Sequence, residues 1–265
     1  MSKKKKYIID KKVESILRKF NPTPEQVKVL LDEIQNPSKK ETRKYHLNPV
    51  GDVIRYGVYG DRHVGSVYYD NEATQRFAEE AKKWNVQFML DCGDSIDGSF
   101  NMHRGMWREQ SQLGFDAQLE ELVRTTPDLG VKIYHINGNH DYSFLKSEGM
   151  DLGEHYAKEC KGVVHLGTSN ATLEIGKTRI QLLHPGGGTS YALSYKPQKI
   201  VEAFEGGTKP EILHVGHYHK MNQMFYRNVH VFLNGCLQSQ TPFMMEHGLA
   251  AHKGSWLVAF EANKN

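Results

Sequence analysis

The sequence predicts a layered α/β fold in which two β-sheets pack face to face between helices. Two observations lead to this expectation. Between residues 53 and 136, short β-branched or aromatic runs alternate with amphipathic helical stretches, as in sheets with helical crossovers. After Gly162 the strand-like runs follow one another with few helices between them, which favours antiparallel pairing in the second half.

The expected elements follow from these runs in chain order, and no internal repeat interrupts them. Strands are expected at 53–59, 86–90, 131–136, 163–166, 171–175, 178–183, 211–215, 224–226, 229–233 and 255–260. Helices are expected where apolar residues recur at helical spacing, at 72–84, 107–123 and 199–204. The alternation predicts one main domain with a mixed arrangement of strands.

The N-terminal residues differ from the rest in composition. Residues 1–48 are expected to form a basic helical extension and linker, and 49–265 the main domain. The extension combines the lysine cluster 3–6 with the amphipathic segment 13–20, and 36–48 is expected to be the linker. It could be an arm that docks a protein partner or nucleic acid, or a solvated extension packed on the main domain. We favour the second, because no recognition motif is present.

Bulk composition excludes several classes of protein. With 265 residues, 38% hydrophobic and 25% charged, the chain is near globular averages and not of disordered type. No apolar run is long enough to span a membrane, and no signal-type region follows the lysine cluster, so a cytoplasmic location is expected. Cys92, Cys160 and Cys236 are expected to be reduced, buried thiols. The net charge of +3 permits an anionic substrate without demanding nucleic acid.

Side chains that can bind metal ions stand at the ends of five strand candidates. The segments are Gly60-Asp61-Arg62-His63, Asp91-Cys92-Gly93-Asp94-Ser95-Ile96-Asp97, Asn137-Gly138-Asn139-His140-Asp141, His184-Pro185-Gly186 and Gly216-His217-Tyr218-His219. In open α/β sheets ligands bind outside the carboxyl ends of the strands, so distant segments meet in space. Any one segment is ordinary turn chemistry, but the ordered set predicts a site.

The candidate ligands form a mixed nitrogen and oxygen set, which consists of Asp61, His63, Asp94, Asn139, His184, His217 and His219. The set has no thiolate and is too large for one tetrahedral zinc, so it predicts two divalent ions. Mn is preferred, with Fe, Zn, Ni or Mg as alternatives. Two-metal sites hold their ions about 3.5–4 Å apart, which requires a shared carboxylate, and Asp94 is expected to supply it.

The five segments, in this order, resemble the signature of the calcineurin-like metallophosphoesterase superfamily. The resemblance covers roughly 53 to 261 and implies a four-layer αββα sandwich with two mixed β-sheets flanked by helices. It also implies hydrolysis of a phosphate ester at a two-metal centre, with His140 protonating the leaving group and Asp141 orienting His140. The implied ligands are Asp61, His63, Asp94 and His219 for one ion, and Asp94, Asn139, His184 and His217 for the other.

These residue types suit phosphoester hydrolysis on chemical grounds. Two cations neutralise the ester and supply a metal-bridged hydroxide that attacks phosphorus, and a histidine beside them protonates the leaving oxygen. Asp97 is expected to orient its turn without binding an ion. Weaker candidates for substrate binding are His103 and Arg104, in the loop after the second segment, and Tyr142, which could stack on a base or sugar.

The neighbours of the motifs exclude some branches of the superfamily. Gly98 follows Asp97 and Asp141 follows His140, where serine/threonine protein phosphatases typically have Arg and Glu. We therefore expect a phosphodiesterase, and DNA-repair exonucleases of the SbcD type, acting on DNA or RNA, are among the candidates. The alternatives are a phosphomonoesterase acting on a nucleotide or small metabolite, and a metal-binding interaction scaffold without activity. The filled ligand positions and His140 favour an enzyme over a scaffold.

Overall fold

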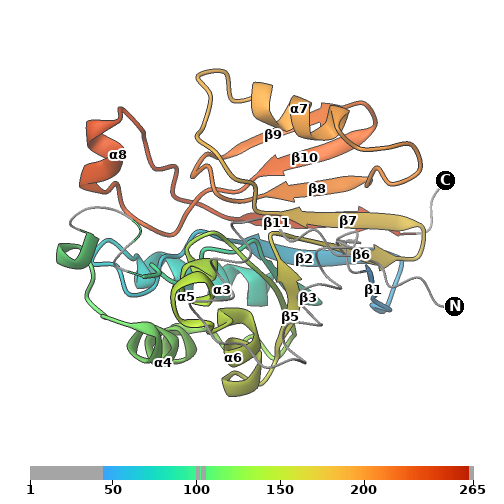
Figure 1. Ribbon diagram of the computed structural model, residues 1–265. Coiled ribbons are helices and arrows are strands. Elements are labelled where there is room, and N and C mark those ends of the chain that lie inside the picture. The colour runs from blue at the N-terminus through green and yellow to red at the C-terminus, as the bar shows by residue number, and fades with distance from the viewer. Residues whose placement is uncertain (1–43, 100–101, 103–105, 263–265) are drawn as a thin grey trace, which may run out of the picture. The chain divides into compact units, whose positions relative to one another are not determined.

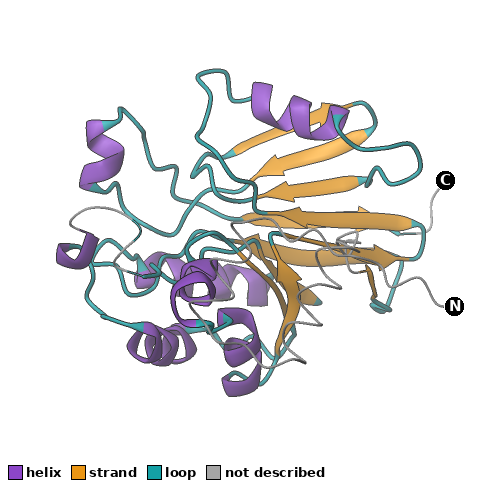
Figure 2. Cartoon of the chain, in the orientation of Figure 1, coloured by secondary structure: helices purple, strands orange, loops and turns teal. Residues whose placement is uncertain are grey.

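The computed structural model describes residues 44–99, 102 and 106–262, which belong to the compact unit Arg43–Asn265. The helical extension predicted for the N-terminal residues lies outside the described residues as far as residue 43, so the extension stays a prediction. Within the described part, the chain forms two β-sheets with helices on their outer faces (Figure 1). Figure 2 shows the same arrangement by type of secondary structure.

The first sheet has five strands in the order β11-β2-β3-β4-β5. The strands are β2 Val53–Tyr59, β3 Phe88–Asp91, β4 Ile133–Asn137, β5 Val163–Thr168 and β11 Trp256–Glu261. β2 to β5 are parallel, and β11 pairs with β2 in antiparallel fashion. Because parallel neighbours direct their carboxyl ends to one edge, the segments after β2, β3 and β4 lie together.

The second sheet has six strands in the order β1-β6-β7-β8-β10-β9. The strands are β1 Lys44–His46, β6 Asn170–Ile175, β7 Thr178–Leu183, β8 Ile212–Val215, β9 Asn222–Tyr226 and β10 Val229–Leu233. β7, β8 and β10 are parallel to one another, whereas β6 and β9 each pair with a neighbour in antiparallel fashion. The segments after β7 and β8 therefore also share an edge.

Four of the helices cover the outer face of the first sheet (Figure 1). They are α3 Asn71–Lys83, α4 Phe115–Thr125, α5 Asp141–Glu148 and α6 Leu152–Glu159. α7 Tyr195–Glu202 lies on the outer face of the second sheet, and η1 Met106–Arg108 and α8 Pro242–Glu246 are short helices in the connecting segments.

Three hydrophobic clusters fill the interfaces between these layers. Leu90 and Ile136 of the first sheet meet Leu182 of the second in the cluster between the sheets. A second cluster joins the first sheet to its helices, and a third, which includes Val201, joins the second sheet to α7. Full burial of one such aliphatic side chain contributes about 1.5–3 kcal/mol, so the three interfaces hold the sandwich together. The predicted α/β sandwich with two mixed sheets is confirmed.

The predicted strands are present with small shifts of their ends, but two local predictions are wrong. The helix expected at 107–123 begins only at Phe115, because Gly114 has a φ of 83° and the preceding residues pair with the segment after His63. Part of the expected linker 36–48 forms β1, which pairs in parallel with β6. Within the described part of the chain, three α-helices were not expected, among them α6, whose first turn is capped by the carboxylate of Asp151.

The cysteines and the helices bear on two further expectations. Cys92, Cys160 and Cys236 are free thiols; Cys92 and Cys236 are buried as expected, but Cys160, which follows the last turn of α6, is only partly buried. Among the described residues, no helix has the length and apolar character needed to cross a membrane. The cytoplasmic location stays a prediction.

Candidate metal centre

All the predicted ligands lie just beyond the carboxyl ends of strands. Asp61 follows β2, Asp94 follows β3 and Asn139 follows β4, whereas His184 and His217 follow β7 and β8 of the second sheet. Backbone hydrogen bonds join these segments, since the Asp61 N–H donates to the Gly93 carbonyl at 2.8 Å. The structure thus brings ends of both sheets to one site.

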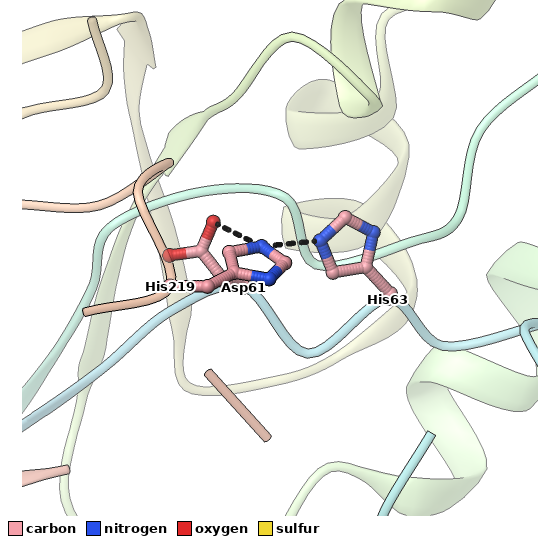
Figure 3. A group of neighbouring side chains, drawn as sticks. All are labelled: Asp61, His63 and His219. Carbon is pink, nitrogen blue, oxygen red and sulfur yellow. Dashed lines mark hydrogen bonds and ion pairs between the residues drawn. The ribbon is translucent and has the colours of Figure 1, made fainter. Parts of the chain in front are cut away.

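Asp61, His63 and His219 form the first group, and their ligand atoms all lie within 4.8 Å of one another. Nε2 of His219 is 3.3 Å from Oδ1 of Asp61 and 3.1 Å from Nε2 of His63 (Figure 3). Asp61 also links the two sheets, because its two carboxylate oxygens accept the His217 N–H at 2.9 and 3.0 Å. Two imidazoles and a carboxylate that face one another in this way suit a divalent transition metal.

Asp94, His184 and His217 form the second group at the same spacing. Nε2 of His184 is 3.1 Å from both Oδ2 of Asp94 and Oδ1 of Asn139. Oδ1 of Asn139 is also 2.8 Å from Nδ1 of His217, so the amide oxygen lies among the other donor atoms. Nδ1 of His184 donates to the Cys92 carbonyl at 2.7 Å, which leaves Nε2 as the nitrogen that can bind an ion.

Backbone strain is concentrated at these positions. Nine described residues other than glycine have a positive φ, and five of them are predicted ligands, namely Asp61, His63, Asp94, His217 and His219. Their φ values lie between 50° and 78°, in the left-handed region that side chains other than glycine rarely adopt. Such residues cost of order 1–3 kcal/mol each and are retained where a site requires their direction.

Glycines allow the segments to approach one another. A Cβ at Gly138 would collide with the Asp94 carboxylate, and one at Gly216 would lie 2.8 Å from the Cys92 carbonyl oxygen and 3.0 Å from Nδ1 of His184. The ligands can therefore converge only if these two positions carry no side chain.

The charges of the site support cation binding. Burial raises the pKa of Asp94, but the neighbouring His184 and His140 outweigh it and hold that pKa well below the usual value. Burial lowers the pKa values of His184 and His219, but Asp94 and Asp61 respectively outweigh it and raise them to about 9 and about 10. The Asp94 carboxylate is thus in its ionised form, and cation binding at the two histidines would release protons.

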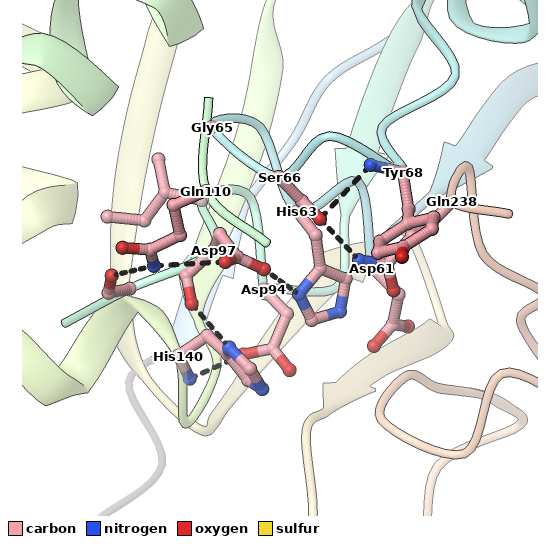
Figure 4. A network of polar contacts seen from close by, with 12 residues as sticks. Asp61, His63, Gly65, Ser66, Tyr68, Asp94, Asp97, Gln110, His140 and Gln238 are labelled. Atoms are coloured by element: carbon pink, nitrogen blue, oxygen red, sulfur yellow. Dashed lines mark hydrogen bonds and ion pairs between the residues drawn. The ribbon is translucent and has the colours of Figure 1, made fainter. Parts of the chain in front are cut away.

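His140 and Asp97 lie beside the two groups (Figure 4). Nδ1 of His140 is 2.6 Å from the backbone carbonyl of Asp97, and the His140 N–H donates to Oδ1 of Asp94 at 2.8 Å. The carboxylate of Asp97 is 3.6 Å from Nδ1 of His63, and Asp97, His63 and His140 form a third group of potential ligands. Since a carbonyl can only accept, Nδ1 of His140 carries the proton of that bond.

Asp141 contacts the backbone of two ligand segments, and its role in orienting His140 stays a prediction. Its carboxylate accepts the Gly138 N–H at 2.8 Å and the Ile96 N–H at 3.0 Å, so it joins the second and third segments. As the first residue of α5, Asp141 is well placed for these backbone groups, and the carbonyl of Asp97 is the group found at Nδ1 of His140. Burial raises the pKa of Asp141 to about 6, although the nearby His135 lowers that pKa.

The structure gives no test of the three weaker substrate-binding candidates, which stay predictions. Tyr142 lies on α5 with the Lys146 ammonium 5.2 Å from its ring centroid. His103 and Arg104 lie outside the described residues.

Sequence reasoning missed a buried polar network beneath the site. Arg62, between two predicted ligands, is fully buried, and its Nη2 lies 3.4 Å from Oδ2 of Asp91 and donates to the Tyr156 hydroxyl at 3.2 Å. The same Asp91 oxygen accepts the Ser95 hydroxyl at 2.7 Å and lies 3.3 Å from Nδ1 of His135. The sequence signal for this network was the presence of charged residues, Arg62 and Asp91, at the ends of apolar strands. This network connects the ends of β2, β3 and β4.

The fold and the two ligand groups together define the class of protein, a metallophosphoesterase sandwich with a candidate dinuclear His/Asp centre. Residues 54–223 match the family model described as calcineurin-like phosphoesterase. Because this match covers more than half of the chain, the protein belongs to the calcineurin-like phosphoesterase family.

Curated relatives include two proteins that are both named DNA polymerase II small subunit. The protein of Halobacterium salinarum is 24% identical over 239 residues, which cover 76% of this chain and 47% of the relative. The protein of Methanothermobacter thermautotrophicus is 24% identical over 228 residues, which cover 69% and 47%. The chain thus spans about half the length of these relatives. A solved structure described as a novel archaeal phosphodiesterase is 16% identical, with a TM-score of 0.41 over 69% of this chain and 84% of that one.

Proposed function

We propose that this protein is a metal-dependent phosphoester hydrolase that cleaves a phosphodiester, with nucleic acid as the preferred substrate class. The observation that carries the proposal is the convergence of the two ligand groups from both sheets, with His140 beside them. The family consists largely of metal-dependent hydrolases of phosphate esters, and every position of its signature is filled in this chain.

The residues divide the work in the following way. Asp61, His63 and His219 would hold one ion, His184, His217 and Asn139 the other, and Asp94 would contact both. Bound ions, with Mn as the preferred metal, would neutralise the phosphate and activate water. Because the Nδ1 proton of His140 is used in the bond to Asp97, the proton for the leaving oxygen would come from Nε2 of the doubly protonated ring, the imidazolium.

Nucleic acid is the favoured substrate because the curated relatives are named as subunits of a DNA polymerase. A phosphomonoesterase acting on a nucleotide or small metabolite is the enzymatic alternative. The same name, small subunit, favours one non-enzymatic candidate, which is a metal-binding scaffold in a DNA-related protein assembly. The predicted N-terminal arm would then be a docking segment.

The test is hydrolysis of bis-p-nitrophenyl phosphate and p-nitrophenyl phosphate with added Mn, followed by a panel of labelled single- and double-stranded DNA and RNA. We expect faster cleavage of the diester. His140→Gln should reduce kcat by about 10²- to 10⁴-fold, the usual contribution of a general acid, without removing the ions. His230→Gln is the matched control, because His230 is exposed on β10.

The outcomes separate the candidates. Cleavage of the monoester alone would exclude the diesterase, and activity on neither ester, with metal still bound, would favour the scaffold. If the protein neither binds Mn nor cleaves an ester, the proposal is wrong.

A further inference from the structure

Asp97 uses separate atoms for separate neighbours. Its backbone carbonyl accepts Nδ1–H of His140 at 2.6 Å, and Oδ1 of its carboxylate lies 3.6 Å from Nδ1 of His63. Its other carboxylate oxygen, Oδ2, accepts a hydrogen bond from Nε2 of Gln110 at 2.9 Å. Figure 4 shows Asp97 between these three residues. The orientation of Asp97 therefore affects both His63, a predicted ligand, and His140, the predicted proton donor.

Gln110 contacts the turn at two points. Both hydrogens of its Nε2 are used, since the second bond runs to the Gly98 carbonyl at 2.8 Å. Gln110 is 8% exposed, and its Oε1 is buried without a hydrogen-bond partner. The amide orientation follows from chemistry, because only N–H groups can face a carboxylate and a carbonyl together. A buried carbonyl left unpaired indicates that these two bonds determine the rotamer.

Gln110 is itself anchored beside the first ligand segment. It forms an isolated β-bridge with Ser66, three residues after His63, and the Ser111 N–H donates to the Gly65 carbonyl at 2.7 Å. A second glutamine, Gln118 of α4, accepts the Gly98 N–H at 2.8 Å and donates to the Gly98 carbonyl at 3.0 Å. Both glutamines thus hold Gly98, whereas among the described residues the Asp97 carboxylate accepts from Gln110 and not from Gln118. The backbone near Gln110 is therefore tied to the loop that carries Asp61 and His63.

The turn next to Gln110 also packs against the start of α5. Gly98 has a φ of 85°, and a Cβ there would lie 2.7 Å from the His140 carbonyl oxygen. The Ser99 N–H donates to the Ser143 hydroxyl at 2.8 Å, and that hydroxyl donates to the His140 carbonyl at 2.6 Å. Little room is left between the turn and His140, so a rotation of the Asp97 peptide would move the carbonyl away from the imidazole.

We propose that Gln110 is a positioning residue, which holds the Asp97 carboxylate and the Gly98 carbonyl so that the Asp97 carbonyl faces Nδ1 of His140. In terms of the reaction, this inference rests on the proposed function. The consequence is that one proton stays on Nδ1 in the bond to Asp97, and Nε2, which would carry the second proton of the imidazolium, keeps one direction toward the two ligand groups. Small errors in such a direction are costly, because proton transfer requires the donor within hydrogen-bond reach of the leaving oxygen.

The first test needs no activity. Long-range ¹H–¹⁵N spectra at a pH where the ring is neutral report which nitrogen of His140 carries the proton. In the wild type we expect the Nδ1–H form. Gln110→Met has similar length and no donor, so the tautomers should become mixed, whereas Gln112→Met should leave the wild-type spectrum. Gln112 lies in the same segment, and within the described structure its side chain makes no hydrogen bond to Asp97 or Gly98.

The second test uses the leaving group. A positioning defect at the proton donor should lower kcat/KM about 10- to 100-fold for a dinucleotide, whose alkoxide leaving group needs a proton. The same variant should lose less than about 3-fold with bis-p-nitrophenyl phosphate, because p-nitrophenolate leaves readily without one. A general loss of structure or of metal would reduce both rates alike. Bound Mn, measured by elemental analysis, should be unchanged.

Gln110→Glu is the second variant if Gln110→Met fails to fold, since it keeps the shape and replaces the donor by an acceptor. A wild-type tautomer in the folded variant, or equal losses on both substrates, would overturn the positioning role. A wild type that cleaves no ester with Mn overturns the proposed function instead, and the tautomer comparison then decides the inference by itself.

Discussion

Lowering the pH from 7.5 to 4.5 should destabilise the fold through one buried histidine. His214 of β8 is fully buried between the sheets, its Nε2 lies 2.9 Å from the Tyr56 hydroxyl of β2, and its ring stacks on Phe232 with centroids 5.0 Å apart. Since β2 and β8 lead into ligand segments, this contact joins the two halves of the candidate site.

The magnitude follows from the pKa. Burial lowers the pKa of His214 to about 3, against an unfolded value of about 6.5. Between these values the unfolded chain binds a proton that the folded state does not, so stability falls as the pH falls. Above about pH 6.5 the buried neutral His214 costs no stability, and as the pH falls from there toward about 3 the stability is lost progressively. The loss between pH 7.5 and 4.5 is about 2.7 kcal/mol, at about 1.4 kcal/mol per pH unit once the unfolded histidine is charged.

The assay is urea unfolding across this pH range in EDTA, for the wild type and for His214→Gln. Other titrating groups are shared by the two proteins, so the difference between their curves isolates His214. We expect the wild type to lose about 2.7 kcal/mol more than the variant between the two pH values. Curves that stay parallel within about 0.5 kcal/mol, the usual limit of additivity, would refute the reasoning.

Three further predictions concern the metal centre. Asn139→Ala should reduce bound Mn in elemental analysis, whereas His140→Gln should keep the ions and slow turnover; loss of metal in both variants would contradict this division. Gly138→Ala should weaken Mn binding about 10- to 100-fold in calorimetry, because the added Cβ would collide with the Asp94 carboxylate. The control Gly206→Ala, whose Cβ would lie in open space, should bind Mn as the wild type does. Equal affinities of the two variants would be inconsistent with the close approach at Gly138. Mn at about 100 times its Kd should raise stability by about 2.7 kcal/mol per site in thermal unfolding, and EDTA should reverse the gain; an unchanged Tm would count against the metal centre.

Periodicity predicted most strands correctly, because alternating or continuous apolar runs reflect which faces are buried. It failed where tertiary contacts override local preference. The apolar spacing at 107–123 is helical, but Gly114 and the bridge between Ser66 and Gln110 delay the start of α4. β1 was missed because three residues carry too little pattern, and their strand exists only through pairing with β6.

The sequence by itself determined the family signature, the identity of the candidate ligands and the α/β class, since these depend on which residue types follow each strand. The tertiary structure decided how the ligands divide into groups and which atoms face one another. It also decided that the Asp97 carbonyl lies at Nδ1 of His140, and that Gln110 lies beside Asp97. The reason is physical: hydrogen-bond partners far apart in the chain are set by the approach of separate strand ends, which no local pattern encodes.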